Sequence, residues 1–189
     1  GEPIPARAPH APGSPRRFAG VACALLALPA LVWTGLTLRA SILDRAGQKG
    51  TGQWTLINAA ENAVVISTIN AAVEARVLSS MKNARVAAST QLHGPRGDVK
   101  TPHAELIAKV HDALYASKIV SYAQGFDLMR AMSEKKSWSL DLGGIAGIWR
   151  GGCIIRARFL KHITEAYRDE PRLPNLMLAP FFRDALNTA

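Results

Sequence analysis

The helical spacing of apolar residues is the feature that most constrains the fold of this chain. Between residues 103 and 136 the apolar positions recur at spacings of four, three, four and three residues. These positions are Tyr115, Ile119, Tyr122, Phe126 and Met129. Residues three and four apart share one face of an α-helix, so the pattern predicts a helix about 50 Å long at 1.5 Å per residue.

A second apolar stripe on the same segment predicts a central position for this helix. The stripe contains Leu106, Val110 and Leu114. Apolar residues on more than one face are typical of a helix buried on several sides. Helical spacing alone explains the aromatic and methionine stripe, so we interpret it as core and not as a cofactor site.

The rest of the chain from residue 51 also follows a helical pattern. No alternating apolar and polar run of strand length occurs, and no strand–helix–strand repeat predicts a nucleotide-binding sheet. Thr51, beside Gly50, is the expected N-cap of the first helix. A later helix is expected to bury Ile155, Phe159, Ile163 and Tyr167. The sequence therefore predicts an all-α, multi-helix fold with a long central helix.

The first forty residues differ from the rest. Residues 1–17 are rich in Pro, Ala and Arg and are expected to be disordered. Residues 18–40 form an apolar segment, of which 18–38 carry no charge and are long enough to cross a bilayer about 30 Å thick. A membrane or export segment, a buried helix and translation of an unrelated reading frame all remain open. Residues 41–189 form the expected helical domain.

Charge and cysteine content exclude several classes of protein. The net charge is +9, but the basic residues are scattered and interleaved with acids, which favours a solvated surface over a nucleic-acid interface. Cys23 and Cys153 lie far apart, without the spacing of a zinc site or a disulfide framework. We therefore predict no metal site.

The loop GQKGTG, residues 47–52, is a candidate anion site. It has neither the order of residues of a P-loop nor the third glycine of a dinucleotide fingerprint. Its glycines would let backbone N–H groups approach an anion, and a helix N-terminus is expected directly after it. Lys49 adds a charge and Thr51 a hydroxyl. An anion site and an ordinary turn both remain open.

Arg76 is the second candidate, because it lies near the apolar face of a predicted helix. A buried guanidinium needs an anionic partner. Glu74 or Glu61 would serve structurally, and a bound phosphate would serve functionally. Spacing alone favours the structural interpretation. No arrangement of histidine, serine and acid typical of a catalytic triad occurs, so no catalytic residue is predicted.

Four segments together resemble a known family. They are ILDRAGQKGTGQWT, AVEARVLSS, LYASKIVSYAQGFDLMR and WSLDLGGIAGIWRGGCIIRARFL. They resemble the carboxyl-terminal helical domain of the decarboxylating 6-phosphogluconate dehydrogenases, from about Ile42 to about Asn187. The resemblance implies that Lys49, Thr51 and Arg76 bind the substrate phosphate. It also implies that GIWRGGCIIR serves packing and a subunit interface.

The resemblance further implies an activity, a cofactor and partners. The family oxidises 6-phosphogluconate with NADP and releases CO2 to give ribulose 5-phosphate in the pentose phosphate pathway. The resemblance implies a homodimer in the cytoplasm, with 6-phosphogluconate as its ligand and no nucleic-acid partner. It argues against a membrane role for residues 18–38. Membrane association or export through that segment stays the alternative location.

The segments that carry the family's cofactor domain and catalytic lysine have no counterpart in the sequence, and the sequence also stops before the family's carboxyl-terminal tail, so we expect a partial domain truncated at both ends. We therefore expect part of an enzyme that binds no NADP by itself and contributes phosphate binding and dimerisation. Whether the chain is itself an enzyme stays open. The alternative is a non-catalytic helical module that dimerises or binds sugar phosphates.

Overall fold

The computed structural model describes residues 42–94 and 100–189. Its elements are α2 (Thr51–Glu61), α3 (Ser67–Ser80), α4 (Lys82–Gln91), α5 (His103–Lys136), α6 (Leu142–Ile148), α7 (Leu160–Asp169), the short 3₁₀-helix η1 (Leu176–Leu178) and α8 (Pro180–Thr188). No strand occurs in these two ranges, and the predicted all-α fold is confirmed.

The chain divides into two compact units, residues 1–44 and 45–189, and α2 to α8 all belong to the second. The predictions for residues 1–17 and 18–40 lie outside the described residues. None of the helices in the described part is long and apolar enough to cross a membrane.

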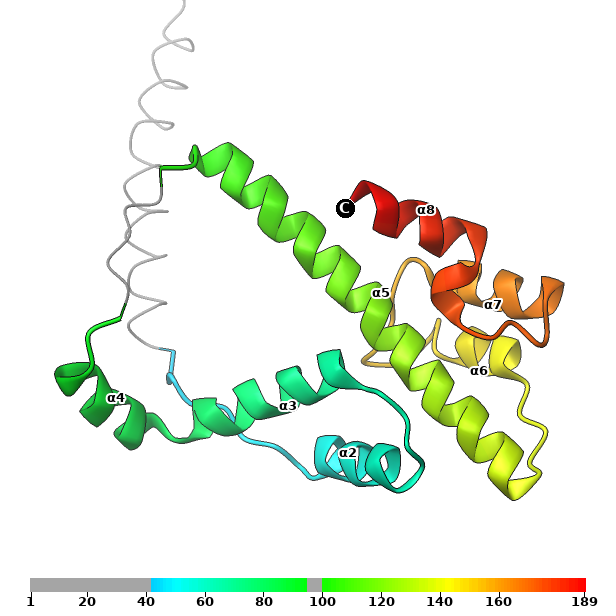
Figure 1. Cartoon of the computed structure of the whole chain (residues 1–189), viewed down its shortest axis with the longest axis horizontal. Helices are drawn as coiled ribbons and strands as arrows, with labels where there is room; N and C mark the ends of the chain where they lie inside the picture. Colours follow the sequence, from blue (N-terminus) through cyan, green and yellow to red (C-terminus); the bar gives the residue numbers. More distant parts are fainter. Residues whose placement is uncertain (1–41, 95–99) are drawn as a thin grey trace, which may run out of the picture. The chain divides into compact units, whose positions relative to one another are not determined.

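Helix α5 organises the second unit, and its bounds agree with the predicted helix over 103–136. Helix α5 contacts α6, η1 and α8, and α7 packs on α6. Figure 1 shows α6, α7 and α8 on one side of α5, with α2 and α3 on the other. The core lies between these elements and includes Ile119 and Phe126 from α5, Phe159 just before α7, and Phe182 from α8. Ring centroids of Phe159 and Phe182 lie 5.8 Å apart in an edge-to-face contact. Aromatic pairs of this geometry add to the free energy gained by burial alone.

The prediction that α5 is buried on several sides is correct for its second half and wrong for its first. Of the predicted second stripe, Val110 and Leu114 are 59% and 68% exposed, whereas Leu106 is partly buried. The nearby Ile107, Val110 and Leu114 form an exposed apolar set, since Ile107 is 69% exposed. Their helical spacing places them on one face, but no described element covers that face. Of the later predicted stripe, Phe159, Ile163 and Tyr167 are buried. Ile155 is 43% exposed, because the helix begins only at Leu160 and Ile155 lies in the loop between α6 and α7, outside the helical register that buries the other three.

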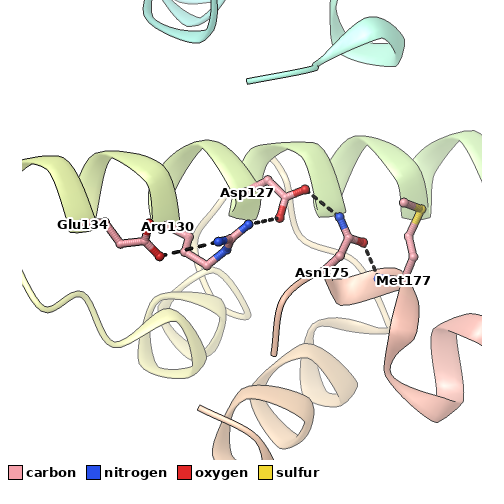
Figure 2. Close-up of polar contacts among 5 residues, drawn as sticks. All are labelled: Asp127, Arg130, Glu134, Asn175 and Met177. Atoms are coloured by element: carbon pink, nitrogen blue, oxygen red, sulfur yellow. Dashed lines mark hydrogen bonds and ion pairs between the residues drawn. The ribbon is translucent and has the colours of Figure 1, made fainter. Parts of the chain in front are cut away.

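A polar chain of contacts fixes the segment that leads into α8 (Figure 2). Asn175 donates from Nδ2 to Oδ2 of Asp127 on α5 at 2.6 Å. Its own side-chain oxygen accepts the Met177 N–H at 2.9 Å and so caps η1. Arg130 lies between Asp127 and Glu134, at 3.3 and 3.5 Å. The half-buried Asp127 carboxylate is thereby paired on both oxygens, which offsets the cost of its desolvation.

Gln124 connects α5 to the start of α3. Its side chain is buried, and Oε1 accepts the N–H groups of Thr68 and Ile69 at 3.1 and 3.2 Å. The first N–H groups of a helix have no partner within the helix, so a side chain from α5 here satisfies two of them. Because α3 also carries Arg76, this contact sets the position of a candidate site residue.

We predict that Gln124→Ala lowers the free energy of unfolding by about 1–3 kcal/mol, because two partly buried N–H groups lose their acceptor. Urea denaturation followed by circular dichroism measures the change. Gln91→Ala, at the exposed end of α4, is the control and should leave the midpoint unchanged within about 0.5 kcal/mol. Equal stability of the two variants would show that Gln124 does not hold α3.

Candidate functional site

The glycine loop has a backbone conformation that explains where α2 begins. Gly50 has φ of 97°, in the left-handed region that glycine adopts without steric cost, and it occupies the N-cap position. The prediction that Thr51 is the N-cap is therefore wrong, since Thr51 is the first residue of α2. No side chain caps this helix, and no acidic residue lies in its first turn.

The amino end of α2 consequently presents unpaired N–H groups and the positive end of the helix dipole. Trp54 N–H makes the first backbone hydrogen bond of the turn, to the Gly50 carbonyl at 2.9 Å. Lys49 and Thr51 flank this end and are both exposed. The loop therefore offers an ammonium group, a hydroxyl and backbone donors within a few residues of one another.

Arg76 reaches the same loop from α3. Its Nε donates to the carbonyl oxygen of Gly47. Within the described ranges no carboxylate pairs with Arg76, and Glu74 instead accepts a hydrogen bond from Asn70 Nδ2 at 2.9 Å. The prediction that Arg76 pairs with Glu74 or Glu61 is therefore wrong, and its partner is a backbone carbonyl. The remaining four N–H donors of the guanidinium stay available to a ligand.

Ser79 makes a second contact between α3 and the glycine loop, which the sequence did not predict. The Ala46 N–H donates to Ser79 Oγ at 3.2 Å. Ser79 lies three residues after Arg76, so both side chains leave α3 on nearly the same face and hold adjacent loop residues. This spacing within EARVLSS was the available signal, but it does not identify which loop the hydroxyl meets.

Gly52 allows α2 to approach α3 closely. A Cβ atom at this position would lie 2.8 Å from Cγ2 of Val73, closer than real Cβ contacts allow. The second glycine of GTG thus serves the packing of α2 on α3, which in turn keeps Arg76 beside the loop. The three predicted phosphate-binding residues are therefore brought together by this loop and by one neighbouring helix.

The other polar side chains of the described residues form neither a metal-binding group nor a recognisable catalytic arrangement. No group of three or more His, Cys, Asp or Glu side chains that could hold a metal occurs among residues 42–94 and 100–189. The histidines at 111 and 162 make local contacts with Asp112 and Glu165 on their own helices. Burial, followed by the nearby Asp127 carboxylate, raises the pKa of Tyr167, which suits a core phenol and not an acid–base group.

Comparisons with known proteins test the family resemblance. The family model described as 6-phosphogluconate dehydrogenase, C-terminal domain, matches residues 32–189. The chain belongs to the 6-phosphogluconate dehydrogenase family. It is 52% identical over 155 residues to the decarboxylating enzyme of Schizosaccharomyces pombe, and 53% identical over 157 residues to that of Synechocystis.

These alignments cover 82% and 81% of this chain, and 32% of each relative. A solved structure of Plasmodium falciparum 6-phosphogluconate dehydrogenase is also similar, with a TM-score of 0.73 and 40% identity over 80% of this chain and 33% of that one. That enzyme was studied in its apo form, with its cofactor NADP+ and with its substrate 6-phosphogluconate. The family and fold predicted from the four segments are confirmed, and the chain spans about a third of the length of these relatives.

We predict that Gly52→Ala destabilises the protein by about 1 kcal/mol, because overpacking against Val73 outweighs the better helix propensity of alanine. In a Val73→Ala background the same change should stabilise, since the Cγ atoms that it would meet are gone. Urea denaturation of the four proteins in this cycle measures the coupling. The same sign of effect in both backgrounds would contradict the close approach of α2 and α3.

Proposed function

We propose that this chain provides the substrate-phosphate site and the dimerisation surface of an NADP-dependent 6-phosphogluconate dehydrogenase. The observation that supports it most strongly is the contact of Arg76 with the Gly47 carbonyl, which joins the guanidinium to the loop that also contains Lys49 and Thr51. The full reaction is the oxidative decarboxylation of 6-phosphogluconate to ribulose 5-phosphate. The phosphate is far from the reacting carbons, so its binding positions the substrate and takes no part in the chemistry.

Each of the three residues has a distinct role in holding the phosphate. The Lys49 ammonium supplies a mobile point charge, and the Arg76 guanidinium supplies planar donors that match two phosphate oxygens. Thr51 supplies a hydroxyl at the start of α2, where the helix dipole also favours an anion. A phosphate with about two negative charges is thus met by two positive charges and several neutral donors.

NADP is not assigned to any residue of this chain. The described ranges contain no strand, and the glycine loop lacks the dinucleotide fingerprint. The residues present therefore do not fit the usual dinucleotide site of dehydrogenases. In the proposed enzyme, cofactor binding and hydride transfer belong to the part of the relatives that this chain does not match.

The phosphate site is tested by calorimetric titration of the purified chain with 6-phosphogluconate. We predict that Lys49→Ala and Arg76→Ala each weaken binding about 10-fold to 100-fold, because a charge-assisted hydrogen bond contributes about 1.5–3 kcal/mol. Thr51→Val should weaken it less, since it removes a neutral donor.

The matched control is Arg172→Ala, which removes one exposed positive charge from the loop after α7. Affinity should be unchanged in this variant. An equal loss in Arg172→Ala and Arg76→Ala would indicate attraction by overall charge and would contradict a specific site. Circular dichroism establishes that each variant is folded.

The alternative is a non-catalytic helical module that dimerises or binds sugar phosphates. The exposed apolar face of α5 at Ile107, Val110 and Leu114 supports the dimerisation that both proposals include, so activity has to distinguish them. We predict no NADPH from the chain alone with 6-phosphogluconate and NADP, as followed by absorbance. NADPH formation should appear when the unmatched amino-terminal part of the Schizosaccharomyces pombe relative is added as a separate polypeptide. Phosphate binding without any rescue would favour the non-catalytic module.

A further inference from the structure

The loop between α6 and α7 forms a second cationic site. A cavity of about 710 Å³ lies beside it, lined by the side chains of Arg150, Arg156, Arg158 and Lys161 and by Gly147 and Gly151. This volume is within the usual range of small-molecule sites, about 300–1,000 Å³. None of the residues proposed for the substrate phosphate lines this cavity.

The charges around the cavity are not balanced by acids. Within the described part of the chain, Arg150, Arg156 and Arg158 have neither a hydrogen-bonded nor an ion-paired side chain. No acid occurs between residues 142 and 164. Glu165 lies 3.5 Å from Lys161 but is shared with His162 at 3.0 Å. Three exposed guanidinium groups therefore line one cavity without a paired carboxylate, which gives the cavity a positive potential that attracts anions.

The backbone of the loop forms two tight turns. The Arg150 and Arg156 N–H groups donate to the carbonyls of Gly147 and Cys153, at 3.2 Å each, so these two donors are already used within the loop. Gly152 adopts φ of 66°, and the position that a Cβ would take at Gly151 has no atom within 4 Å. Backbone N–H groups in such a glycine-rich turn can face an anion that approaches closely.

We propose that this cavity binds a small oligophosphate, an anion with at least two linked phosphate groups. One phosphate carries about two negative charges and would leave the cluster positive, whereas two or three linked phosphates match three guanidinium groups and an ammonium. Arginine also binds phosphate oxygens in a bidentate geometry. This ligand class differs from the single phosphate proposed at the Lys49 loop.

The test is calorimetric titration of the full chain with inorganic tripolyphosphate, in a Lys49→Ala, Arg76→Ala background that removes the other phosphate site. We expect one bound tripolyphosphate, with affinity at least 10-fold above that for orthophosphate and falling as salt is raised. Arg156→Gln and Arg158→Gln should each reduce affinity about 10-fold, Arg158→Lys should retain part of it, and Arg172→Gln should leave it unchanged.

Three results of the titrations would each overturn the proposal. They are no binding in this background, equal affinity for tripolyphosphate and orthophosphate, and equal losses in Arg158→Gln and the control Arg172→Gln. A fall in sedimentation mass in the arginine variants with tripolyphosphate affinity unchanged would also overturn it, and would instead indicate the subunit interface that the family resemblance implied for GIWRGGCIIR. The proposal for the Lys49 loop stands or fails separately, because 6-phosphogluconate titration tests it in the unmodified chain.

Discussion

The packing of α5 against α3 on one side and α6 to α8 on the other is the interaction on which the arrangement of this domain depends. Phe126 and Ile119 anchor the core formed with α6 to α8, while Gln124 on the same helix holds the first N–H groups of α3. Both contacts are made by the same helix, α5, which is 34 residues long. Since α3 carries Arg76 and Ser79, the geometry of the glycine loop follows indirectly from the packing of α5.

The glycine loop shows how structural and binding roles can share the same atoms. Gly50 supplies the left-handed turn that starts α2, and Gly52 supplies the space for Val73. Arg76 uses one donor on the Gly47 carbonyl, which fixes the guanidinium plane beside the loop. A guanidinium already oriented by a backbone contact loses less rotational freedom when it binds a phosphate, so less of the binding free energy is lost to ordering it.

The sequence predicted the class of fold and the bounds of α5 because helical periodicity is local. It did not predict the exposure of Ile107, Val110 and Leu114, since periodicity identifies a face but not what covers it. N-cap preference favours Thr51 at the start of α2, but the N-cap is Gly50, which adopts the positive φ that the turn before the helix requires. The hydrogen bonds of Gln124 and Ser79 could not be predicted from local patterns, because their partners lie 56 and 33 residues away in the chain.

The positive charge of this chain is organised in two different ways. At the glycine loop, the Gly47 carbonyl accepts a hydrogen bond from Arg76, so this guanidinium has a partner that holds it without a ligand. In the loop between α6 and α7, the exposed Arg150, Arg156 and Arg158 side chains have no such partner among the described residues. An anion bound there would lower the local positive potential and stabilise the folded state by mass action. The folded state of this domain is therefore expected to respond more strongly to an oligophosphate at the α6–α7 loop than to a monophosphate at the α2 loop.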